Sequence, residues 1–545
     1  MTEARSFIQV FLDQLEAEPT KAHVTEIHGP TALPFDGKTL GALVARARGA
    51  LRARGVASGA RVGLLAPNSA HWVAADVALL AEGTIVVPLY ARQEPAELVA
   101  MMHDAGTTLV VCGTEKLADG VRAHWPEAPI VMLDALFAGE PVHAPAVPRA
   151  ATDCVTIVYT SGTSGEPKGV MITRAGVDHM LPVTRDGLSE LMGARAGQDR
   201  LFHYLPFCFM GSRIVLWTAL YRAGGILVST SLENLAEELK TAKPHYFLNV
   251  PALLERIKKG VESKLATQAR PVRALYARGV SAYQRTAAGT ASGFDRAVLA
   301  LAKRVVFERV RQQIGADLVC LICGSAPLHP DTQRWFEMLG VPVYQVYGLT
   351  ETTAIVTMDV PGRGAAGKVG VVIRGVEMRL GEGDELLVRG PNVFAGYWQR
   401  PEATAAALAD DWFHTGDQCA IDAGGNLEVI GRVGNLLVAE SGHNIAPEPI
   451  EAKILAELGG AESCVVLGHG RPYLTAIVTG KLAAADVQTA LDRVNETLPH
   501  YRRVRKFHVS SEPFTIESGL LTANQKLRRK AIEKHYAAAV QELYA

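Results

Sequence analysis

The segment 160–169 constrains this chain more than any other part of its sequence. It reads Thr-Ser-Gly-Thr-Ser-Gly-Glu-Pro-Lys-Gly and follows an apolar run at 155–159 that predicts a buried strand. Glycine lets backbone N–H groups approach a ligand closely, while hydroxyls and an ammonium add hydrogen bonds and positive charge. This combination suits a polyphosphate better than a packed core. The candidate ligands are Thr160, Ser161, Gly162, Thr163, Ser164, Gly165 and Lys168.

Segment 160–169 differs from two widespread phosphate-binding motifs. A Walker A motif requires Gly-Lys-Ser/Thr, whereas Lys168 here lies between Pro167 and Gly169. No Gly-x-Gly-x-x-Gly pattern follows a predicted strand and opens a helix, so a dinucleotide-binding fold has no direct support. An ordinary polar surface loop has a similar composition. The position after a buried strand favours the phosphate interpretation, and motifs elsewhere in the chain decide between the two.

The length and composition predict a globular protein of at least two domains. The chain has 545 residues, of which 48% are hydrophobic and 20% charged, with a formal net charge of −1. This balance gives no general preference for nucleic acid or for a membrane. The first residues lack the basic and apolar pattern of a signal peptide, and no run of eighteen apolar residues occurs. We therefore expect a cytoplasmic enzyme that does not bind nucleic acid.

Cysteine usage gives no sign of a metal or redox site. Cys320 and Cys323 form a Cys-x-x-Cys pattern, but both lie in the apolar run 318–323, which predicts a strand. A zinc site needs turn residues and a second pair of ligands. We expect these thiols to be buried as small hydrophobic groups.

Helical and strand patterns alternate along most of the chain, which predicts an α/β fold. Residues 39–54 place apolar side chains on one face of a helix. Strands are predicted at 62–65, 84–89, 108–112 and 130–133.

The segment 261–304 is strongly basic. It contains eight lysines and arginines but only Glu262 and Asp295 as acidic residues. A helical segment that extends into solvent explains the excess of basic over acidic residues. The excess of basic residues is also explained by a surface that contacts nucleotide phosphates, or by one that contacts anionic lipid head groups in a weak peripheral membrane interaction.

Four further motifs follow segment 160–169 in the second half of the chain. Two of them follow predicted strands directly, and a third includes the strand-like run 426–430. The motifs are 324–327 (Gly-Ser-Ala-Pro), 347–352 (Tyr-Gly-Leu-Thr-Glu-Thr), 412–417 with 431–435, and 519–530.

The five motifs together resemble the adenylate-forming superfamily, which includes acyl-CoA synthetases, luciferases and peptide-synthetase adenylation domains. The resemblance implies an α/β protein with a large N-terminal domain of layered α/β subdomains, residues 1–434. A small mobile α+β C-terminal domain, residues 435–545, is implied as well. The implied activity is that of an acid–thiol ligase, an AMP-forming acyl-CoA synthetase that uses ATP, CoA and Mg²⁺.

The resemblance also implies roles for individual residues. The turn Gly324, Ser325, Ala326 and Pro327 corresponds to the part of the family site that lies against adenine. Tyr347 and Gly348 border the base, Thr350 contacts the α-phosphate, and Glu351 binds Mg²⁺. Asp417 accepts hydrogen bonds from the ribose hydroxyls, and Arg432 provides a second ribose or phosphate contact.

Two lysines complete the implied catalytic set, which consists of Lys526, Thr350, Glu351 and Lys168. Lys526 corresponds to the mobile lysine that reaches the carboxylate and the α-phosphate, and Lys168 positions the departing pyrophosphate. The neighbouring cations Arg528, Arg529 and Lys530 are expected to lie on a solvated face.

In the family, the small domain rotates between the two half-reactions. Asn435 occupies the hinge position, where the family usually has Asp or Lys. Asn tolerates unusual backbone angles, so rotation remains compatible with this residue. Ser441, Gly442 and His443 match the loop that borders the thiol tunnel.

The sequence constrains the identity of the carboxylic acid substrate less than it constrains the nucleotide site. The second half of the chain resembles the long-chain fatty acyl-CoA ligase branch, but Phe209 replaces a histidine that this branch places beside the acyl site. Phe209 and Met210 are the candidate acyl-pocket residues, and the apolar stretch 210–228 fits either an acyl tunnel or plain core.

Three classes of function follow. A fatty acyl-CoA ligase fits best, with a CoA ligase for an aromatic or other acid as a variant. The second is an acyl-AMP ligase that loads the phosphopantetheine of a carrier protein. The third, a nucleotide-binding protein without catalysis, is disfavoured because the catalytic residues are intact. The sequence does not indicate an oligomeric state.

Overall fold

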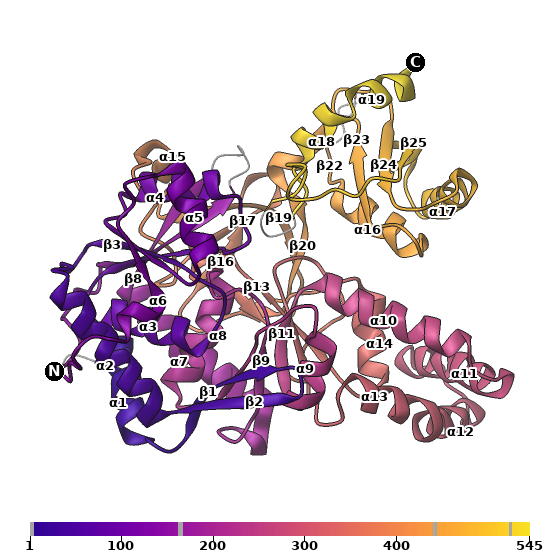
Figure 1. Cartoon of the computed structure of the whole chain (residues 1–545). Helices are drawn as coiled ribbons and strands as arrows, with labels where there is room; N and C mark the ends of the chain where they lie inside the picture. Colours follow the sequence, from indigo (N-terminus) through magenta and orange to yellow (C-terminus); the bar gives the residue numbers. More distant parts are fainter. Residues whose placement is uncertain (1–4, 162–166, 439, 441–443, 523–525) are drawn as a thin grey trace.

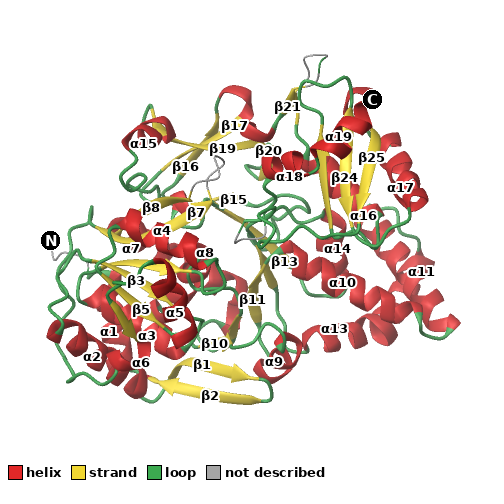
Figure 2. Cartoon of the chain, turned by 45° about the horizontal axis from the view of Figure 1, so that its top comes forward, coloured by secondary structure: helices red, strands yellow, loops and turns green. Residues whose placement is uncertain are grey.

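The computed structural model describes residues 5–161, 167–438, 440, 444–522 and 526–545. Three sheets and their helices form a large N-terminal domain, and a smaller α/β unit follows it at the C-terminal end (Figure 1). Figure 2 shows the sheets as layers covered by helices. The expected α/β architecture with a large and a small domain is therefore present.

The first sheet has six strands and carries the polar segment 160–169 at one edge. Its strands are parallel except for the last pair, which forms an antiparallel hairpin. Their order is β6 (Ile130–Met132), β5 (Leu109–Cys112), β3 (Arg61–Leu65), β4 (Ile85–Leu89), β7 (Cys154–Ser161) and β8 (Pro167–Thr173).

The second sheet has nine strands and supplies the loops around the nucleotide motifs. Its central strands, from β13 to β1, are parallel, and antiparallel strands extend both ends. The order is β15 (Val371–Val372), β14 (Thr357–Met358), β13 (Val343–Tyr347), β12 (Leu321–Cys323), β11 (Tyr246–Asn249), β9 (Leu201–His203), β10 (Ile226–Ser229), β1 (Ala22–His28) and β2 (Thr31–Asp36).

A five-stranded antiparallel sheet lies above these two layers and carries the motif at 412–417. It consists of β16 (Glu377–Leu380), β17 (Glu385–Arg389), β18 (Leu408–Ala409), β19 (Trp412–Ile421) and β20 (Leu427–Arg432).

Helices connect and cover the parallel strands, as the alternating sequence pattern predicts. One of them, α3 (Ala70–Ala81), contacts β3 and β4 of the first sheet and β1 of the second, and all but one of its residues are buried. The others of this domain are α1 (Phe7–Ala17), α2 (Gly37–Ala53), α4 (Pro95–Ala105), α5 (Glu115–His124), α6 (Leu133–Leu136), α7 (Arg174–Met192), α8 (Met210–Tyr221), α9 (Leu235–Ala242), α14 (Pro330–Met338) and α15 (Pro401–Ala407).

The predicted elements agree with the structure within one or two residues at most ends. The helix expected at 39–54 is α2, which begins at Gly37 because the Asp36 side chain accepts a hydrogen bond from Thr39 N and caps it. Cys320 and Cys323 are buried, and burial raises the pKa of the Cys320 thiol to about 12. The expectation that these thiols are buried is confirmed.

The basic segment 261–304 is helical, as expected, and lies at the edge of the large domain (Figure 1). It belongs to a run of consecutive helices after β11. These are α10 (Pro251–Ala266), α11 (Arg270–Ala287), α12 (Gly293–Ala302), a π-helical turn at Lys303–Phe307 and α13 (Glu308–Gly315).

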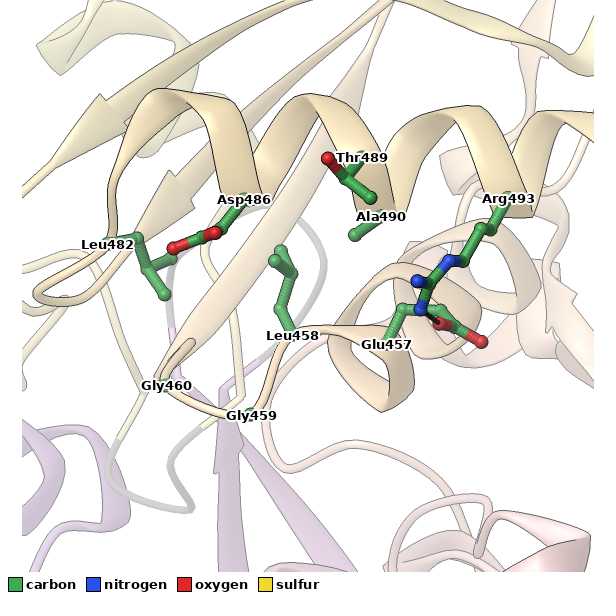
Figure 3. A pocket seen from close by; sticks show the side chains of 9 residues that line it. All are labelled: Glu457, Leu458, Gly459, Gly460, Leu482, Asp486, Thr489, Ala490 and Arg493. Carbon is green, nitrogen blue, oxygen red and sulfur yellow. Dashed lines mark hydrogen bonds and ion pairs between the residues drawn. The ribbon is translucent and has the colours of Figure 1, made fainter.

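The C-terminal unit has hydrophobic cores of its own, which include Ile450, Val478 and Ile532. A cavity of about 330 Å³ opens at its surface between the last residues of one helix and the side of another, where Arg493 forms an ion pair with Glu457 (Figure 3). The cavity contains none of the predicted site residues. The elements of the unit are β21 (Leu437–Val438), β22 (Asn444–Ile445), α16 (Glu448–Glu457), β23 (Ser463–Leu467), β24 (Leu474–Thr479), α17 (Ala484–Glu496), β25 (Val504–Ser510), α18 (Arg529–His535) and α19 (Ala537–Tyr544).

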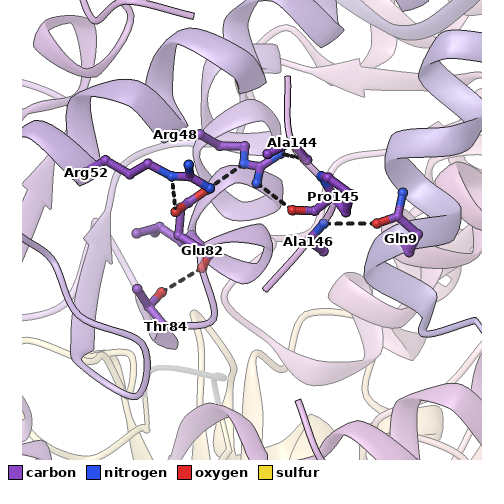
Figure 4. A network of polar contacts seen from close by, with 9 residues as sticks. Gln9, Arg48, Arg52, Glu82, Thr84, Ala144, Pro145 and Ala146 are labelled. Carbon is purple, nitrogen blue, oxygen red and sulfur yellow. Dashed lines mark hydrogen bonds and ion pairs between the residues drawn. The ribbon is translucent and has the colours of Figure 1, made fainter. Parts of the chain in front are cut away.

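Buried ion pairs join elements of the large domain that are distant in sequence. Arg48 of α2 donates to Glu82 at 2.7 Å and also to the carbonyl oxygens of Ala144 and Pro145, which fastens the segment before β7 (Figure 4). Because Arg52 also donates to Glu82, this carboxylate is fully paired.

A second buried pair contacts β7, the strand that leads into segment 160–169. Arg213 of α8 pairs with Asp76 of α3, and its Nη1 donates to Thr156 Oγ1 of β7 at 2.5 Å. Asp76 accepts a further hydrogen bond from Trp217 Nε1 at 2.9 Å. The side chains of the pair are 0% and 1% exposed. This network connects two helices of the core to the strand that leads into the polar segment.

No helix among the described residues combines the length and apolar character required to cross a bilayer.

Candidate active site

The described ends of the polar segment, 160–161 and 167–169, belong to the paired strands β7 and β8. Thr160 and Lys168 are register partners on the two strands. Gly169 has a close-packing role, because a Cβ atom there would lie 2.7 Å from Ile157 Cγ2. Four predicted phosphate ligands, Gly162, Thr163, Ser164 and Gly165, lie outside the described residues.

Lys168 and Glu351 meet at one side chain, Tyr397. The Lys168 ammonium lies 5.1 Å from the centroid of the Tyr397 ring, within cation–π range, and Tyr397 Oη donates to Glu351 Oε1 at 3.0 Å. Backbone hydrogen bonds hold this arrangement, since Phe394 N donates to Glu351 O and Trp398 N donates to Gly169 O. The hairpin and the motif 347–352 are therefore parts of one site.

A short 3-10 turn at Thr350–Thr352 carries Thr350 and Glu351. Buried Asn392 supports it by donating to the carbonyl oxygens of Thr352 and Ile355. At Gly348 a Cβ atom would lie 2.0 Å from the Ala354 carbonyl oxygen, so only glycine fits. The turn is thus held tightly at the carboxyl end of β13.

The predicted adenine turn lies at the carboxyl end of the adjacent strand. β12 and β13 are parallel neighbours, with Cys323 opposite Gln345, so Gly324–Pro327 and the Tyr347 motif emerge side by side. Ser325 has a positive φ of 73°, which marks a tight turn. The structure therefore brings these two motifs together as predicted.

Asp417 lies at the centre of a polar cluster. Arg432 Nε contacts Asp417 Oδ1 at 2.7 Å, and Tyr347 Oη donates to Asp417 Oδ2 at 2.6 Å. Asp417 and Arg432 are direct register partners on β19 and β20, so sheet pairing sets their contact. Burial raises the pKa of Asp417, while Arg432 and Tyr347 act to lower it. Each carboxylate oxygen retains capacity for a further hydrogen bond from a ligand.

Lys526 lies close enough to Asp417, Glu351 and Arg432 for its charge to interact with all three. The residue is exposed to solvent as a whole, but desolvation of its ammonium and then the Arg432 guanidinium lower the pKa of Lys526. The carboxylates of Asp417 and Glu351 act in the opposite direction. In this structure the small domain therefore presents Lys526 to the nucleotide motifs of the large domain.

The expectation for one neighbour of Lys526 is wrong. Arg529 is mostly buried rather than solvated, because its guanidinium donates to Glu451 Oε1 at 2.6 Å and to the Val466 carbonyl oxygen at 2.8 Å. Arg529 therefore contributes to the packing of the small domain, although it belongs to the basic run. Lys530 is exposed, as predicted.

The predicted hinge residue is tied to the small domain. Asn435 Nδ2 donates to Glu448 Oε1 at 2.8 Å, at the start of α16. The predicted thiol-tunnel residues Ser441, Gly442 and His443 lie outside the described residues.

The two candidate acyl-pocket residues have different environments. Phe209 is partly exposed and packs against Tyr90, with ring centroids 5.5 Å apart. Met210 is buried and begins α8, which belongs to the main hydrophobic core along most of its length. The core interpretation of 210–228 thus fits α8 and β10, while Phe209 and Tyr90 remain available at the ends of β9 and β4.

Sequence reasoning missed Tyr397 and Asn392. Their only signal was a location in a Gly- and Pro-containing loop with several aromatic residues, 390–398. That pattern does not specify a partner, because both side chains act on a motif about forty positions earlier in the chain.

Replacing Tyr397 with phenylalanine is expected to lower the rate of adenylation about tenfold, because the hydrogen bond to the Glu351 carboxylate is lost while the aromatic face under Lys168 remains. Pyrophosphate release measured at saturating ATP checks this. Tyr344→Phe, a change at a tyrosine of β13, is the control. An unchanged rate for Tyr397→Phe would contradict a role in holding Glu351.

Comparison with known proteins agrees with this geometry. The family model described as AMP-binding enzyme matches residues 31–398, and the model for the AMP-binding enzyme C-terminal domain matches 434–545. The chain belongs to the AMP-binding enzymes. The assignment to the adenylate-forming superfamily is therefore confirmed, and with it the classification as an AMP-forming acid–thiol ligase.

Individual relatives cover nearly the whole chain. The long-chain-fatty-acid–CoA ligase FadD15 of Mycobacterium bovis is 27% identical over 90% of this chain and 89% of its own length. Long chain acyl-CoA synthetase 3 of Arabidopsis thaliana is 24% identical, covering 91% and 84%. The structure of o-succinylbenzoate CoA synthetase from Bacillus subtilis with its acyl-adenylate intermediate has a TM-score of 0.75 at 20% identity, covering 96% and 98%, and supports the fold.

Proposed function

We propose that this AMP-binding enzyme activates a fatty acid with ATP and transfers the acyl group to CoA. A carboxylate oxygen of the acid attacks the α-phosphorus of ATP, the bond from that phosphorus to its bridging oxygen breaks, and pyrophosphate leaves. The CoA thiolate then attacks the acyl carbonyl carbon, and AMP leaves. The observation that carries the proposal is the convergence of Lys526, Asp417 and Glu351 from two domains.

The charges around this convergence suit the first step. Negative charge develops on the oxygens of the α-phosphorus as the carboxylate attacks, and preorganised donors and cations stabilise it. Lys526 would supply a cation and Thr350 a hydroxyl on that side, while Lys168 belongs to β8, one of the two strands beside the segment that would hold the departing pyrophosphate. Asp417 and Tyr347 would hold the nucleoside.

The site fits a magnesium ion shared with the nucleotide. Glu351 Oε1 accepts a hydrogen bond from Tyr397, and its Oε2 makes no hydrogen bond or ion pair with another described residue. Among the described residues, no group of three or more His, Cys, Asp or Glu side chains can hold a metal by itself. Mg²⁺ typically binds one or two carboxylates together with substrate phosphates. Glu351 would hold the ion, which when bound neutralises phosphate charge.

An apolar acid is supported by two observations. Relatives that cover most of the chain are named long-chain-fatty-acid–CoA ligase and long chain acyl-CoA synthetase. The aromatic pair Phe209 and Tyr90 also offers an apolar surface at the ends of β9 and β4. An aromatic acid also suits an aromatic lining.

Pyrophosphate release across short- to long-chain fatty acids and aromatic acids, with and without CoA, tests the proposal. We expect the highest kcat/KM for a medium- or long-chain fatty acid and acyl-CoA formation only with CoA. Preference for an aromatic acid would overturn the fatty-acid assignment. Accumulation of acyl-AMP without thioester in the presence of CoA would indicate a carrier-protein acceptor.

We propose that the small domain rotates between the two steps and that the domain boundary lies at 434/435. Hydrophobic residues up to Val429 pack in the core of the large domain, and those from Leu437 onward pack in the small domain. Asn435 lies between them and is bonded to Glu448 of the small domain.

Asn435→Pro is expected to slow thioester formation roughly tenfold more than adenylation, because proline restricts φ where the backbone must turn. Rapid-quench measurement of acyl-AMP and acyl-CoA separates the two steps. Asn435→Ala is the matched control, since it removes the hydrogen bond to Glu448 without restricting φ. Equal losses in both steps would argue against a hinge at this residue.

A further inference from the structure

The helical run 251–315 has a charge opposite to the rest of the protein. It contains 13 lysines and arginines but only 4 aspartates and glutamates, a net charge of +9 in a chain whose total is −1. The remainder of the chain is therefore net acidic. Such segregation concentrates a positive potential at one end of the molecule, where these helices lie (Figure 1).

Most of these cations face solvent without a carboxylate partner. All residues of 251–315 are described, and the ion pairs within this run are Arg285–Asp295 and Arg311–Glu308. Arg296, in the first turn of α12, and Lys303 and Arg304, just after its end, are exposed and form no ion pair with another described residue. Their charge is thus available to an external anion.

Two large apolar side chains project from the same part of the surface. Phe294 is 72% exposed and Leu301 is 53% exposed, and Phe294 is the most exposed large hydrophobic residue among those described. They are seven positions apart on α12, so they lie on one side of the helix about two turns apart. Arg304 follows Leu301 by three positions on the same flank.

The exposure of Phe294 and Leu301 does not result from poor packing of α12 against α11. A Cβ atom at Gly279 of α11 would lie 2.5 Å from Ala302 Cβ of α12, which shows how closely these helices approach. Trp335 Nε1 of α14 donates to Tyr276 Oη at 2.8 Å, which ties α11 to the large domain. The helices α11 and α12 are therefore well packed, and the side chains of Phe294 and Leu301 extend from α12 into solvent.

We propose that Phe294, Leu301, Arg296, Lys303 and Arg304, the α12 tip, dock the protein on an anionic lipid bilayer. Phe294 and Leu301 would insert between head groups at one edge of the exposed face of α12, with Arg304 beside them. Arg296 and Lys303, each two positions after one of the apolar residues, lie at the other edge of this face and would contact lipid phosphates there. The phosphates of CoA or ATP would account for the cations but not for the apolar pair. A single-stranded nucleic-acid groove would require several stacking aromatics, and the α12 tip has one.

Vesicle sedimentation tests docking with the full-length protein and no acid, ATP or CoA. The proposal is therefore independent of the proposed function. We expect binding to vesicles of phosphatidylcholine with about one third phosphatidylglycerol to exceed binding to pure phosphatidylcholine at least about tenfold, and to weaken with added salt.

Two variants separate the charged and apolar contributions. The reversal of three charges in Arg296→Glu/Lys303→Glu/Arg304→Glu is expected to lower the partition coefficient on the order of 10²-fold. Phe294→Ser/Leu301→Ser is expected to lower it about tenfold. The matched controls change exposed residues elsewhere on the molecule, Arg46→Glu/Lys116→Glu/Lys481→Glu and Leu33→Ser/Leu232→Ser, and should bind nearly as wild type.

Circular dichroism and pyrophosphate release establish that each variant is folded. Equal binding to neutral and anionic vesicles would overturn the proposal, as would equal losses in the α12-tip variants and their controls. Retention on nucleic acid without binding to vesicles would also overturn it. If the charge-reversal variant fails to fold, the Phe294→Ser/Leu301→Ser variant and the salt titration decide the outcome.

Discussion

Replacing Lys526 with alanine is expected to lower the rate of acyl-adenylate formation by roughly 10²–10³, comparable to the removal of one preorganised donor to a developing oxyanion. Lys526 is the cation that the small domain presents to Asp417 and Glu351, so its loss removes positive charge where the carboxylate attacks. Acid-dependent pyrophosphate release measures this step directly. Transfer from supplied acyl-adenylate to CoA should be affected much less.

The control for this variant is Lys530→Ala, which removes an exposed cation from the same basic run. Arg529 is unsuitable as a control because it pairs with buried Glu451. Acyl-AMP formation at the wild-type rate in Lys526→Ala would remove Lys526 from the adenylation step.

The pH dependence provides a second test of the same residue. Desolvation and Arg432 lower the pKa of Lys526 from the usual lysine value of 10.5. If the protonated form is required, adenylation should decline as pH rises through this lowered pKa, earlier than for an ordinary lysine. A plateau that extends through the normal lysine range would contradict a requirement for protonated Lys526.

Asp76→Ala is expected to destabilise the large domain by about 3–5 kcal/mol, because it leaves the Arg213 guanidinium buried without a counterion. Trp217 Nε1 loses its acceptor as well. Urea unfolding followed by tryptophan fluorescence measures the change, with the transition of the large domain analysed separately from that of the small domain.

Two matched variants sharpen this prediction. Asp119→Ala removes an exposed carboxylate that pairs with Arg122 and should change stability by less than about 1 kcal/mol. Asp76→Leu combined with Arg213→Met removes both buried charges and should recover much of the stability lost in Asp76→Ala. An unchanged unfolding midpoint for Asp76→Ala would show that the buried pair contributes little.

Local patterns in the sequence predicted a helix and several strands of the large domain. Apolar runs bounded by turn residues located β3, β4, β5 and β7, because burial and turn chemistry are properties of a few adjacent residues. The pairing of Asp417 with Arg432 was also accessible, since a short antiparallel connection brings two nearby strands into register.

Contacts between side chains that are far apart in the sequence cannot be predicted from such local patterns. Arg529 looked like one of several equivalent cations, yet it is mostly buried against Glu451, 78 positions away. The pairing of Asp76 with Arg213 crosses 137 positions, and many other carboxylates in the chain are equivalent partners by sequence alone. Such pairings depend on how helices and sheets stack.

Segment 160–169 by itself predicted a buried strand followed by a polar loop, and together with the four further motifs it identified the family. Only the tertiary structure showed that Tyr397 joins Lys168 to Glu351 and that the small domain presents Lys526 to them. The physical reason is the range of the interactions: side-chain chemistry and turn preference are local, whereas a shared site forms only when separate layers pack against one another.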